Sequence, residues 1–140
     1  MSKYRNSKAI VDGIKFDSGA EGERYKILKA KEKAGLIKNL QLQVNYPLLV
    51  NGLKICDYRA DFVYEVGGKT VVEDVKGQLH DVFKLKYKLM YACYGITILI
   101  TKALYKTMNK VKYIVGFEQD SSGLVLPKVP EKGKIRNELR

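Results

Sequence analysis

The sequence predicts an α/β fold in which helices flank a mixed central β-sheet. The expected order of elements is helix, antiparallel strands, helix, strand, helix, strand, which is typical of such folds. A Gly67-Gly68 pair between two strand-like runs is a strong hairpin signal. The chain has 140 residues, of which 46% are hydrophobic and 29% are charged, an ordinary composition for one globular domain with its own core. We therefore expect residues 1–140 to form a single domain.

The first half of the chain is expected to begin with a short basic arm over residues 1–8. Turn pairs, a capping serine and alternating apolar residues then predict the following elements: a hairpin over Ile10–Phe16 that turns at Asp12-Gly13, a helix from Asp17-Ser18 to about Ala34, a strand from Leu36 to Leu49, a turn at Asn51-Gly52 into Leu53–Cys56, and the hairpin strands Tyr58–Glu65 and Lys69–Lys76. Gly35 is expected to end the helix, and Pro47 indicates an edge strand or a break.

The second half alternates helix and strand. The predicted elements are a helix from Asp81 to about Tyr94 that ends at Gly95, a buried strand over Ile96–Ile100, a short helix from the cap Thr101 to Asn109, a strand over Val111–Phe117, and a polar and basic tail over residues 118–140. The alternation suggests a sheet with both parallel and antiparallel neighbours.

The Gly67-Gly68 hairpin places two acids opposite each other. If the glycines are the loop residues, Val66 pairs with Lys69, and counting outward pairs Asp61 with Asp74. Side-chain alternation predicts one face with Arg59, Asp61, Val63, Val72, Asp74 and Lys76, and another with Phe62, Tyr64, Val71 and Val75. Opposed like charges destabilise a sheet, and a hard divalent cation such as Mg²⁺ or Mn²⁺ would compensate them. The alternative is a solvated hairpin whose acids are neutralised by Arg59 and Lys76.

Glu21 is a further acid with two interpretations. In Ser18-Gly19-Ala20-Glu21 it is placed to close a capping box by accepting from the backbone of Ser18. On a helix it also lies about 40° from Tyr25 and about 20° from Leu28, so it projects from the apolar stripe. We favour a site role, in which the carboxylate reaches the rim of the sheet near the two aspartates. Glu23 faces away from this stripe and is expected to be solvated.

The net charge of +11 favours a polyanionic partner, and nucleic acid is the first candidate. Seven lysines and no acid lie between Val82 and Phe117. Those expected to bind DNA phosphates, together with Arg59, are Lys84, Lys88, Lys102, Lys106 and Lys110. The alternative is a solvated basic face. Interleaved tyrosines, including Tyr87, Tyr91, Tyr94 and Tyr105, would stack on bases or close the core.

Other sequence features limit the class of protein. Cys56 and Cys93 match no metal-ligand spacing and are interpreted as small buried hydrophobes in a reducing compartment, and the single His80 gives little scope for a zinc site. Neither an apolar signal core nor a membrane-spanning stretch is present in the sequence. We expect an intracellular protein, in the host cytoplasm if it is encoded by a phage, with no membrane partner and no small-molecule cofactor.

Taken together, Glu21, Asp61 in Ala60-Asp61-Phe62, and Asp74-Val75-Lys76 resemble the active-site signature of the PD-(D/E)-x-K nuclease superfamily. The wider pattern, which includes Phe16-Asp17-Ser18, Arg24-Tyr25 and Val72–Gly77, is similar to a small phage-type endonuclease family that includes Holliday-junction resolvases. The resemblance covers roughly residues 10–100. It departs from the superfamily at Ala60, where a proline is usual. The register turns Glu73 towards the face of Phe62, away from Asp61. We therefore assign the metal ligand to Asp74 and keep Glu73 as a fallback.

The resemblance implies a restriction-endonuclease-like core and Mg²⁺-dependent hydrolysis of DNA phosphodiesters, with Mn²⁺ as a possible substitute. Asp61, Asp74 and the Val75 carbonyl would bind the metal, Glu21 would bind it directly or through water, and Lys76 would help to deprotonate the attacking water. A homodimer that cuts branched DNA is the leading expectation. The alternatives are a nicking or end-processing DNA nuclease without junction preference, and a non-catalytic basic DNA-binding subunit.

Overall fold

The computed structural model describes residues 8–119, 124 and 126. Its elements, in chain order, are β1 (Ala9–Val11), β2 (Ile14–Phe16), α1 (Gly19–Lys33), β3 (Lys38–Val50), β4 (Leu53–Val66), β5 (Lys69–Val75), α2 (Asp81–Tyr94), β6 (Leu99–Met108) and β7 (Val111–Gln119). The predicted basic arm, apart from Lys8, and most of the predicted tail lie outside the described residues. The fold is the predicted α/β class.

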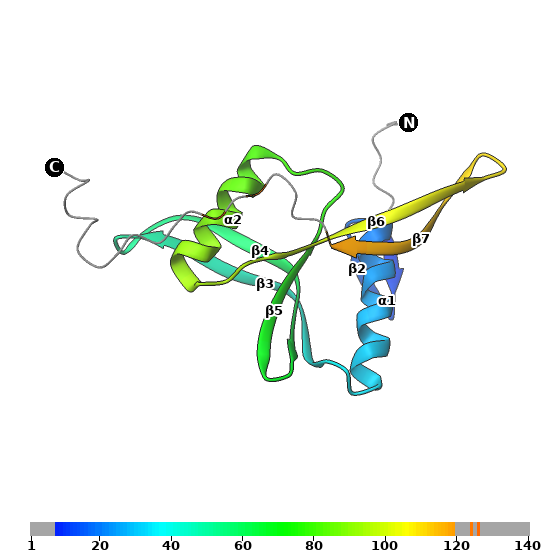
Figure 1. Cartoon of the computed structure of the whole chain (residues 1–140), viewed down its shortest axis with the longest axis horizontal. Helices are drawn as coiled ribbons and strands as arrows, with labels where there is room; N and C mark the ends of the chain where they lie inside the picture. The colour runs from blue at the N-terminus through cyan, green and yellow to red at the C-terminus, as the bar shows by residue number, and fades with distance from the viewer. Residues whose placement is uncertain (1–7, 120–123, 125, 127–140) are drawn as a thin grey trace.

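The central sheet has five strands in the order β3-β4-β5-β6-β7, and β1 and β2 form a separate small hairpin. Neighbouring strands are antiparallel except β5 and β6, which run parallel and are connected through α2. The sheet is therefore mixed, as predicted, and its arrangement with helices is consistent with a restriction-endonuclease-like core. Figure 1 shows the β6–β7 hairpin extending away from the rest of the fold.

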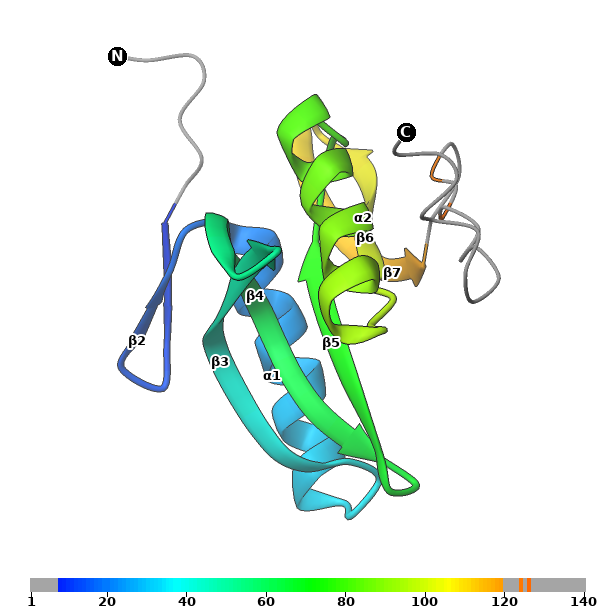
Figure 2. The ribbon, with the colours of Figure 1, turned by 90° about the vertical axis from the view of Figure 1, so that its left-hand side faces the viewer.

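The two helices pack against opposite faces of the sheet (Figure 2). One core cluster joins α1 and the β1–β2 hairpin to the sheet through Phe16, Tyr25, Leu28, Ile37, Phe62 and Tyr64. The other joins α2 to the sheet through Leu48, Tyr58, Ala60, Val63, Val72, Phe83, Tyr87, Met90, Ile98 and Ile100. Phe62 and Val63 are neighbours on one strand and enter different clusters, because strand side chains alternate between faces. Figure 1 and Figure 2 together show the sheet lying between the helices.

The side-chain alternation of β4 breaks at Asp61. Tyr58 packs on the α2 side of the sheet, whereas Phe62, four residues later, packs on the α1 side. The paired strand β3 breaks at the same level, where Gln43 has a φ of 53°. The predicted common face of Arg59, Asp61 and Val63 is therefore wrong for Arg59, which is exposed next to Tyr58. A uniform period of two cannot predict this break.

The short helix predicted over Thr101–Asn109 is wrong, because these residues belong to β6 and the turn that follows it. Thr101 is 1% exposed and pairs with Val75 of β5, while Lys106 pairs with Tyr113 of β7. Spacing of four residues puts lysines on one face of a helix and also on one face of a strand, so the lysine pattern did not distinguish the two. Pairing with strands on both sides decides the structure.

The other predicted elements are confirmed with small shifts. Ser18 caps α1, and its side chain accepts a hydrogen bond from the Glu21 N–H at 3.2 Å. Gly95 ends α2 with a φ of 69°. The predicted strand over Ile96–Ile100 begins only at Leu99, and Leu53–Cys56 is continuous with β4. In the part of the chain that the structure describes, no helix has the length and apolar character needed to cross a membrane.

Candidate functional site

The β4–β5 ladder confirms the predicted register as far as Phe62 opposite Glu73. The backbone pairing of the two strands ends at the next position. There the Asp61 side chain replaces a backbone acceptor, because its Oδ2 accepts a hydrogen bond from the backbone N–H of Val75 at 2.9 Å. Besides burial, the negative charge of Asp74 is one cause of the raised pKa of Asp61, so the two carboxyl groups lie near each other. The two aspartates are therefore brought together where β4 separates from β5.

Asp74 is a buried acid with an unsatisfied oxygen. It is 2% exposed, and its Oδ2 accepts no hydrogen bond. The same oxygen lies 3.3 Å from Lys76 Nζ, an ion pair without hydrogen-bond geometry. Lys76 Nζ also lies 4.7 Å from the centre of the Phe83 ring. A buried polar atom without a partner costs about 1–3 kcal/mol, so this oxygen calls for an explanation other than stability.

Asp61 prefers to be protonated in the folded chain. Burial raises the pKa of Asp61 to about 8, and the hydrogen bond and negative charge of Asp74 add to this. The Val75 N–H and the Lys76 ammonium act in the opposite direction on the pKa but do not cancel the rise. Two carboxyl groups this close to each other repel when both are charged, and a cation between them would remove that repulsion.

Glu21 forms only one half of the predicted capping box, since its backbone N–H donates to Ser18 Oγ and no hydrogen bond from the Ser18 N–H to its carboxylate is found among the described residues. Its backbone takes part in the cap of α1, while its carboxylate has one buried oxygen, Oε2, without a partner. Burial raises the pKa of Glu21 to about 7, and the charges of Asp61 and Asp17 add to the rise. The Lys76 charge and a hydrogen bond with the Ser18 side chain lower this pKa. Glu21 therefore belongs to the electrostatic environment of Asp61 and Lys76, as predicted from the helix geometry. Glu23 pairs instead with Lys26 at the surface.

A cleft of about 680 Å³ opens between the start of α1, the end of β5 and the β6–β7 hairpin. Its lining consists of Asp17, Ser18, Ala20, Glu21, Val75, Lys76, Gly77, Gln78, His80, Lys102, Ala103, Tyr105 and Lys112. Asp61 and Asp74 are not in this lining but lie next to Val75 and Lys76, which are. The cleft thus has the predicted lysine and helix acid on its wall and the two aspartates behind it.

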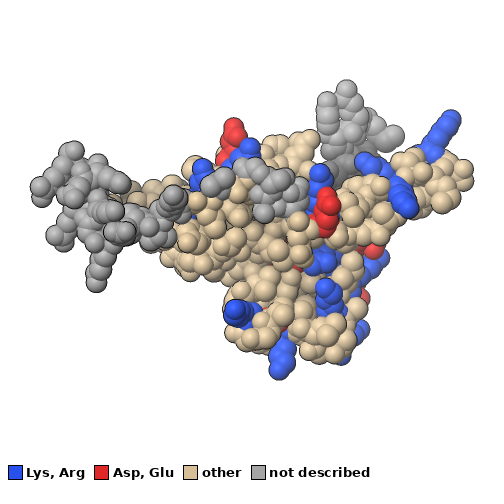
Figure 3. Space-filling model, viewed as in Figure 1, with Lys and Arg blue, Asp and Glu red and all other residues tan. Residues whose placement is uncertain are grey.

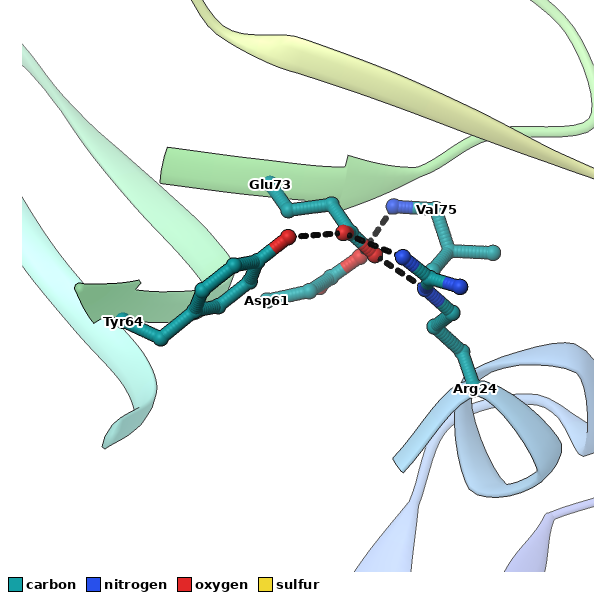
Figure 4. Close-up of polar contacts among 5 residues, drawn as sticks. All are labelled: Arg24, Asp61, Tyr64, Glu73 and Val75. Atoms are coloured by element: carbon teal, nitrogen blue, oxygen red, sulfur yellow. Dashed lines mark hydrogen bonds and ion pairs between the residues drawn. The ribbon is translucent and has the colours of Figure 1, made fainter. Parts of the chain in front are cut away.

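Glu73, the fallback ligand, is occupied by a different set of partners (Figure 4). Its Oε2 accepts from Arg24 Nε at 2.7 Å, and its Oε1 accepts from Arg24 Nη2 at 2.8 Å and from the Tyr64 hydroxyl at 2.7 Å. Glu73 is fully buried, and Arg24 is 6% exposed. Glu73 accepts two hydrogen bonds from the Arg24 guanidinium and one from the Tyr64 hydroxyl, and so it connects α1 to the sheet. Asp74 is the acid of this pair that keeps an oxygen without a hydrogen bond.

The oxygen donors at the aspartates are of the kind that hard cations take, although the described residues do not form a complete set of metal ligands. Across residues 8–119, 124 and 126, no three His, Cys, Asp or Glu side chains lie close enough together to hold a metal ion. Asp61 and Asp74 provide two carboxylates, one with an unsatisfied buried oxygen, and Glu21 provides another such oxygen. Oxygen donors of this kind fit Mg²⁺ or Mn²⁺, which keep several water ligands of their own.

The predicted basic residues are distributed over several surfaces. Lys102 lines the cleft, whereas Arg59, Lys84, Lys88, Lys106 and Lys110 do not. Lys84 and Lys88 lie on α2, across the sheet from α1. The tyrosines also divide: Tyr87 is buried, while Tyr105 is 46% exposed at the cleft. The single lysine field of the sequence is therefore at least two separate surfaces.

Lys112 is a cleft residue that the sequence reasoning missed. Its Nζ lies 4.5 Å from the centre of the Tyr105 ring, on the neighbouring strand. A hairpin turn at Asn109-Lys110 would have pointed to this contact, since asparagine favours the positive φ of such turns. The predicted helix over the same residues concealed it.

The cysteines are only partly as predicted. Cys56 and Cys93 are free, and both are half-buried and not fully buried. The Cys93 thiol donates to the Leu49 carbonyl at 3.1 Å. His80 immediately precedes α2 as its cap residue and lines the cleft.

Comparison with known proteins gives a family and no described function. A family model described as "Protein of unknown function (DUF1064)" matches residues 1–109. The comparisons with curated proteins and with solved structures found no match. The matched range includes Glu21, Asp61, Asp74 and Lys76, and it ends at the turn between β6 and β7. Because the match covers more than half of the 140 residues, the chain belongs to the DUF1064 family.

Proposed function

We propose that this protein is a metal-dependent DNA endonuclease of the PD-(D/E)-x-K type. The observation that carries the proposal is the buried Oδ2 of Asp74, which accepts no hydrogen bond and belongs to a residue that is 2% exposed beside both Asp61 and Lys76. A basic protein that only bound DNA would gain nothing from buried acids next to its anion-binding cleft. The net charge of +11 supports a nucleic-acid substrate.

The residues would divide the work as follows. Asp61 and Asp74, with the Val75 carbonyl, would hold Mg²⁺ or Mn²⁺, and Glu21 would hold it from the α1 side directly or through water. When bound, such an ion neutralises charge that develops on the phosphate and lowers the pKa of a bound water. Lys76 lines the cleft and is 32% exposed in its side chain, so its ammonium would donate a hydrogen bond to the oxygen of an attacking water, orient that water and so help it to lose a proton.

The positions of the lysines support binding to the DNA backbone. Lys102 and Lys112 line the same cleft as Lys76 and Glu21 and would contact phosphates on either side of the scissile bond. Selectivity would then come from DNA shape more than from base sequence. Branched DNA remains our leading substrate, with a homodimer making paired cuts, and expected products carrying a 5′-phosphate and a 3′-hydroxyl.

The test is cleavage of labelled four-way junction, flap, nicked, duplex and single-stranded DNA in Mg²⁺, by the wild type, Asp74→Ala and Lys76→Ala. Both variants should bind DNA and lose cleavage by roughly 10³-fold, the upper range for the loss of one group that stabilises transition-state charge. Cleavage that survives both changes, or that persists in EDTA, would overturn the nuclease proposal.

The same panel separates the narrower alternatives. Equal rates on junction and duplex would replace the resolvase proposal by that of a general nicking or end-processing nuclease. DNA binding by the wild type without cleavage in either Mg²⁺ or Mn²⁺ would favour a non-catalytic DNA-binding subunit.

A further inference from the structure

The β6–β7 hairpin projects from the fold as an arm, defined here as residues 104–115 (Figure 1). Exposed side chains occur along both of its strands. Those that are large and apolar are Leu104, Tyr105, Met108, Val111, Tyr113 and Val115, with exposed fractions between 38% and 65%. Its charged residues are Lys106, Lys110 and Lys112, all exposed, and no acid occurs between them. Figure 3 shows basic side chains at this projecting end of the molecule.

One face of the arm is continuous with the candidate active site. Tyr105 and Lys112 share this face, where the ammonium lies over the ring, and both line the cleft with Lys102. The base of the arm therefore forms a wall of the site that holds Glu21 and Lys76. A ligand bound in the cleft and extending outwards would pass along the arm.

The tip of the arm carries a residue that its backbone does not favour. Four two-residue hairpin turns occur among the described residues, and both residues of each turn have positive φ. In three of them the second position is glycine: Gly13, Gly52 and Gly68, with φ between 74° and 79°. The arm instead has Lys110, with a φ of 65°. A side chain in this region costs about 1 kcal/mol relative to glycine, so a lysine here is better explained by an external contact than by folding.

The arm also has dimensions that match a DNA duplex. From Tyr105 at the cleft to Met108, the last residue of β6, the strand advances about 10 Å, at about 3.3 Å per residue, and Lys110 follows in the turn. Along the axis of a duplex this is about three base pairs, at about 3.4 Å each. A two-stranded ribbon fits the major groove, which is about 12 Å wide. There both faces of the ribbon would be covered, and the exposed apolar residues would meet base edges.

We propose that the arm lies along duplex DNA next to the candidate active site, and that Lys110 contacts a backbone phosphate about three base pairs from the phosphate in the cleft. This inference rests on the proposed function, because it assigns the substrate-holding element of the same site. It requires duplex DNA on at least one side of the scissile bond.

The decisive variant is Lys110→Gly, because the substitution should stabilise the turn and at the same time weaken the binding of duplex DNA. We expect a higher melting temperature, because glycine fits the turn, and weaker binding to a labelled duplex in EDTA. The affinity should fall about 3- to 10-fold, and the slope of log K against log salt should decrease by about one, as expected for the loss of one phosphate contact. Lys69→Ala, at an exposed lysine directly after the Gly67-Gly68 turn, is the matched control and should change neither property.

A length series tests the reach of the arm. Wild-type affinity should rise with duplex length until the tip is engaged, and Lys110→Gly should reach its plateau about three base pairs earlier. Unchanged duplex affinity and salt slope in Lys110→Gly would overturn the proposal. A loss of self-association in sedimentation velocity, with duplex binding intact, would assign the arm to a second copy of the chain and overturn it equally.

These outcomes are separable from the nuclease proposal, because binding is measured in EDTA. If the wild type cuts DNA and Lys110→Gly binds like the wild type, the arm inference fails and the nuclease proposal stands. If Lys110→Gly weakens binding and the wild type cuts nothing in Mg²⁺ or Mn²⁺, the arm inference stands and the nuclease proposal fails.

Discussion

Glu73 and Asp74 are consecutive buried acids on β5, and their surroundings differ in one important respect. Glu73 points to the α1 side and accepts three hydrogen bonds from Arg24 and Tyr64. Asp74 has the Asp61 carboxyl as a neighbour, one oxygen without a donor, and a partly exposed lysine. The hydrogen bonds of Glu73 are therefore satisfied, whereas Asp74 is buried with an unsatisfied oxygen beside another acid. This difference shows that Glu73 contributes to stability, and it supports the proposal that Asp74 binds a ligand or takes part in chemistry.

The largest expected effect on stability is at the satisfied acid. Glu73→Ala leaves the Arg24 guanidinium buried without its partner, and the loss of one member of such a pair costs about 3–5 kcal/mol. Asp74→Ala, the matched change one residue away, should cost at most about 1 kcal/mol, because the lost ion pair is with a partly exposed lysine and the change also removes an unsatisfied buried oxygen and a charge beside Asp61. Urea denaturation measures both. Equal losses in the two variants would remove the distinction between the acids.

Metal should act on the unsatisfied acids and leave the Glu73 network unaffected. Mn²⁺ or Mg²⁺ at about 100 times its dissociation constant should stabilise the wild type by about 2.7 kcal/mol. Thermal denaturation with and without EDTA measures this gain, which Asp74→Ala should lack and Tyr64→Phe should keep. A full gain in Asp74→Ala would place the metal elsewhere.

The pH dependence should be that of acids that are protonated in the folded state. The unfolded pKa values are near 4, and the folded values are about 8 for Asp61 and about 7 for Glu21. The folded chain binds more protons between these limits, so metal-free stability should fall as the pH rises from about 4 to 8. Asp61→Asn removes one such acid and should raise the melting temperature at pH 8 in EDTA by about 3–5 °C, which corresponds to about 1 kcal/mol. A flat profile in the wild type would contradict the proposed environment of Asp61.

The smallest effect is expected at the hydroxyl that completes the Glu73 network. Tyr64→Phe removes the 2.7 Å hydrogen bond to Glu73 Oε1 and keeps the ring packing, so it should cost about 0.5–1.5 kcal/mol. The bidentate contact from Arg24 remains. Urea denaturation checks the value, and a double variant with Glu73→Ala should show less than the sum of the two losses. Simple additivity would show that Tyr64 acts independently of the network.

Local sequence signals were sufficient for most of the elements and for the central pair of acids. Gly67-Gly68 set the register of β4 and β5 by turn geometry, which is a short-range effect. That register is sufficient to place Asp74 and Glu73 on opposite faces of the sheet. Ser18 and Gly95 likewise mark the ends of α1 and α2 through local backbone hydrogen bonds.

Only the tertiary structure decided the partners and the exceptions. Arg24 meets Glu73 across 49 positions of the sequence, which no local pattern encodes. Residues 101–108 form a strand because β5 and β7 flank them, and pairing on both sides outweighs a lysine spacing that also fits a helix. The break in alternation at Asp61 and the contact of Lys112 with Tyr105 likewise depend on neighbouring strands. The sequence by itself determined which acids share a hairpin, while long-range packing determined which of them has its hydrogen bonds satisfied and which keeps an unsatisfied oxygen.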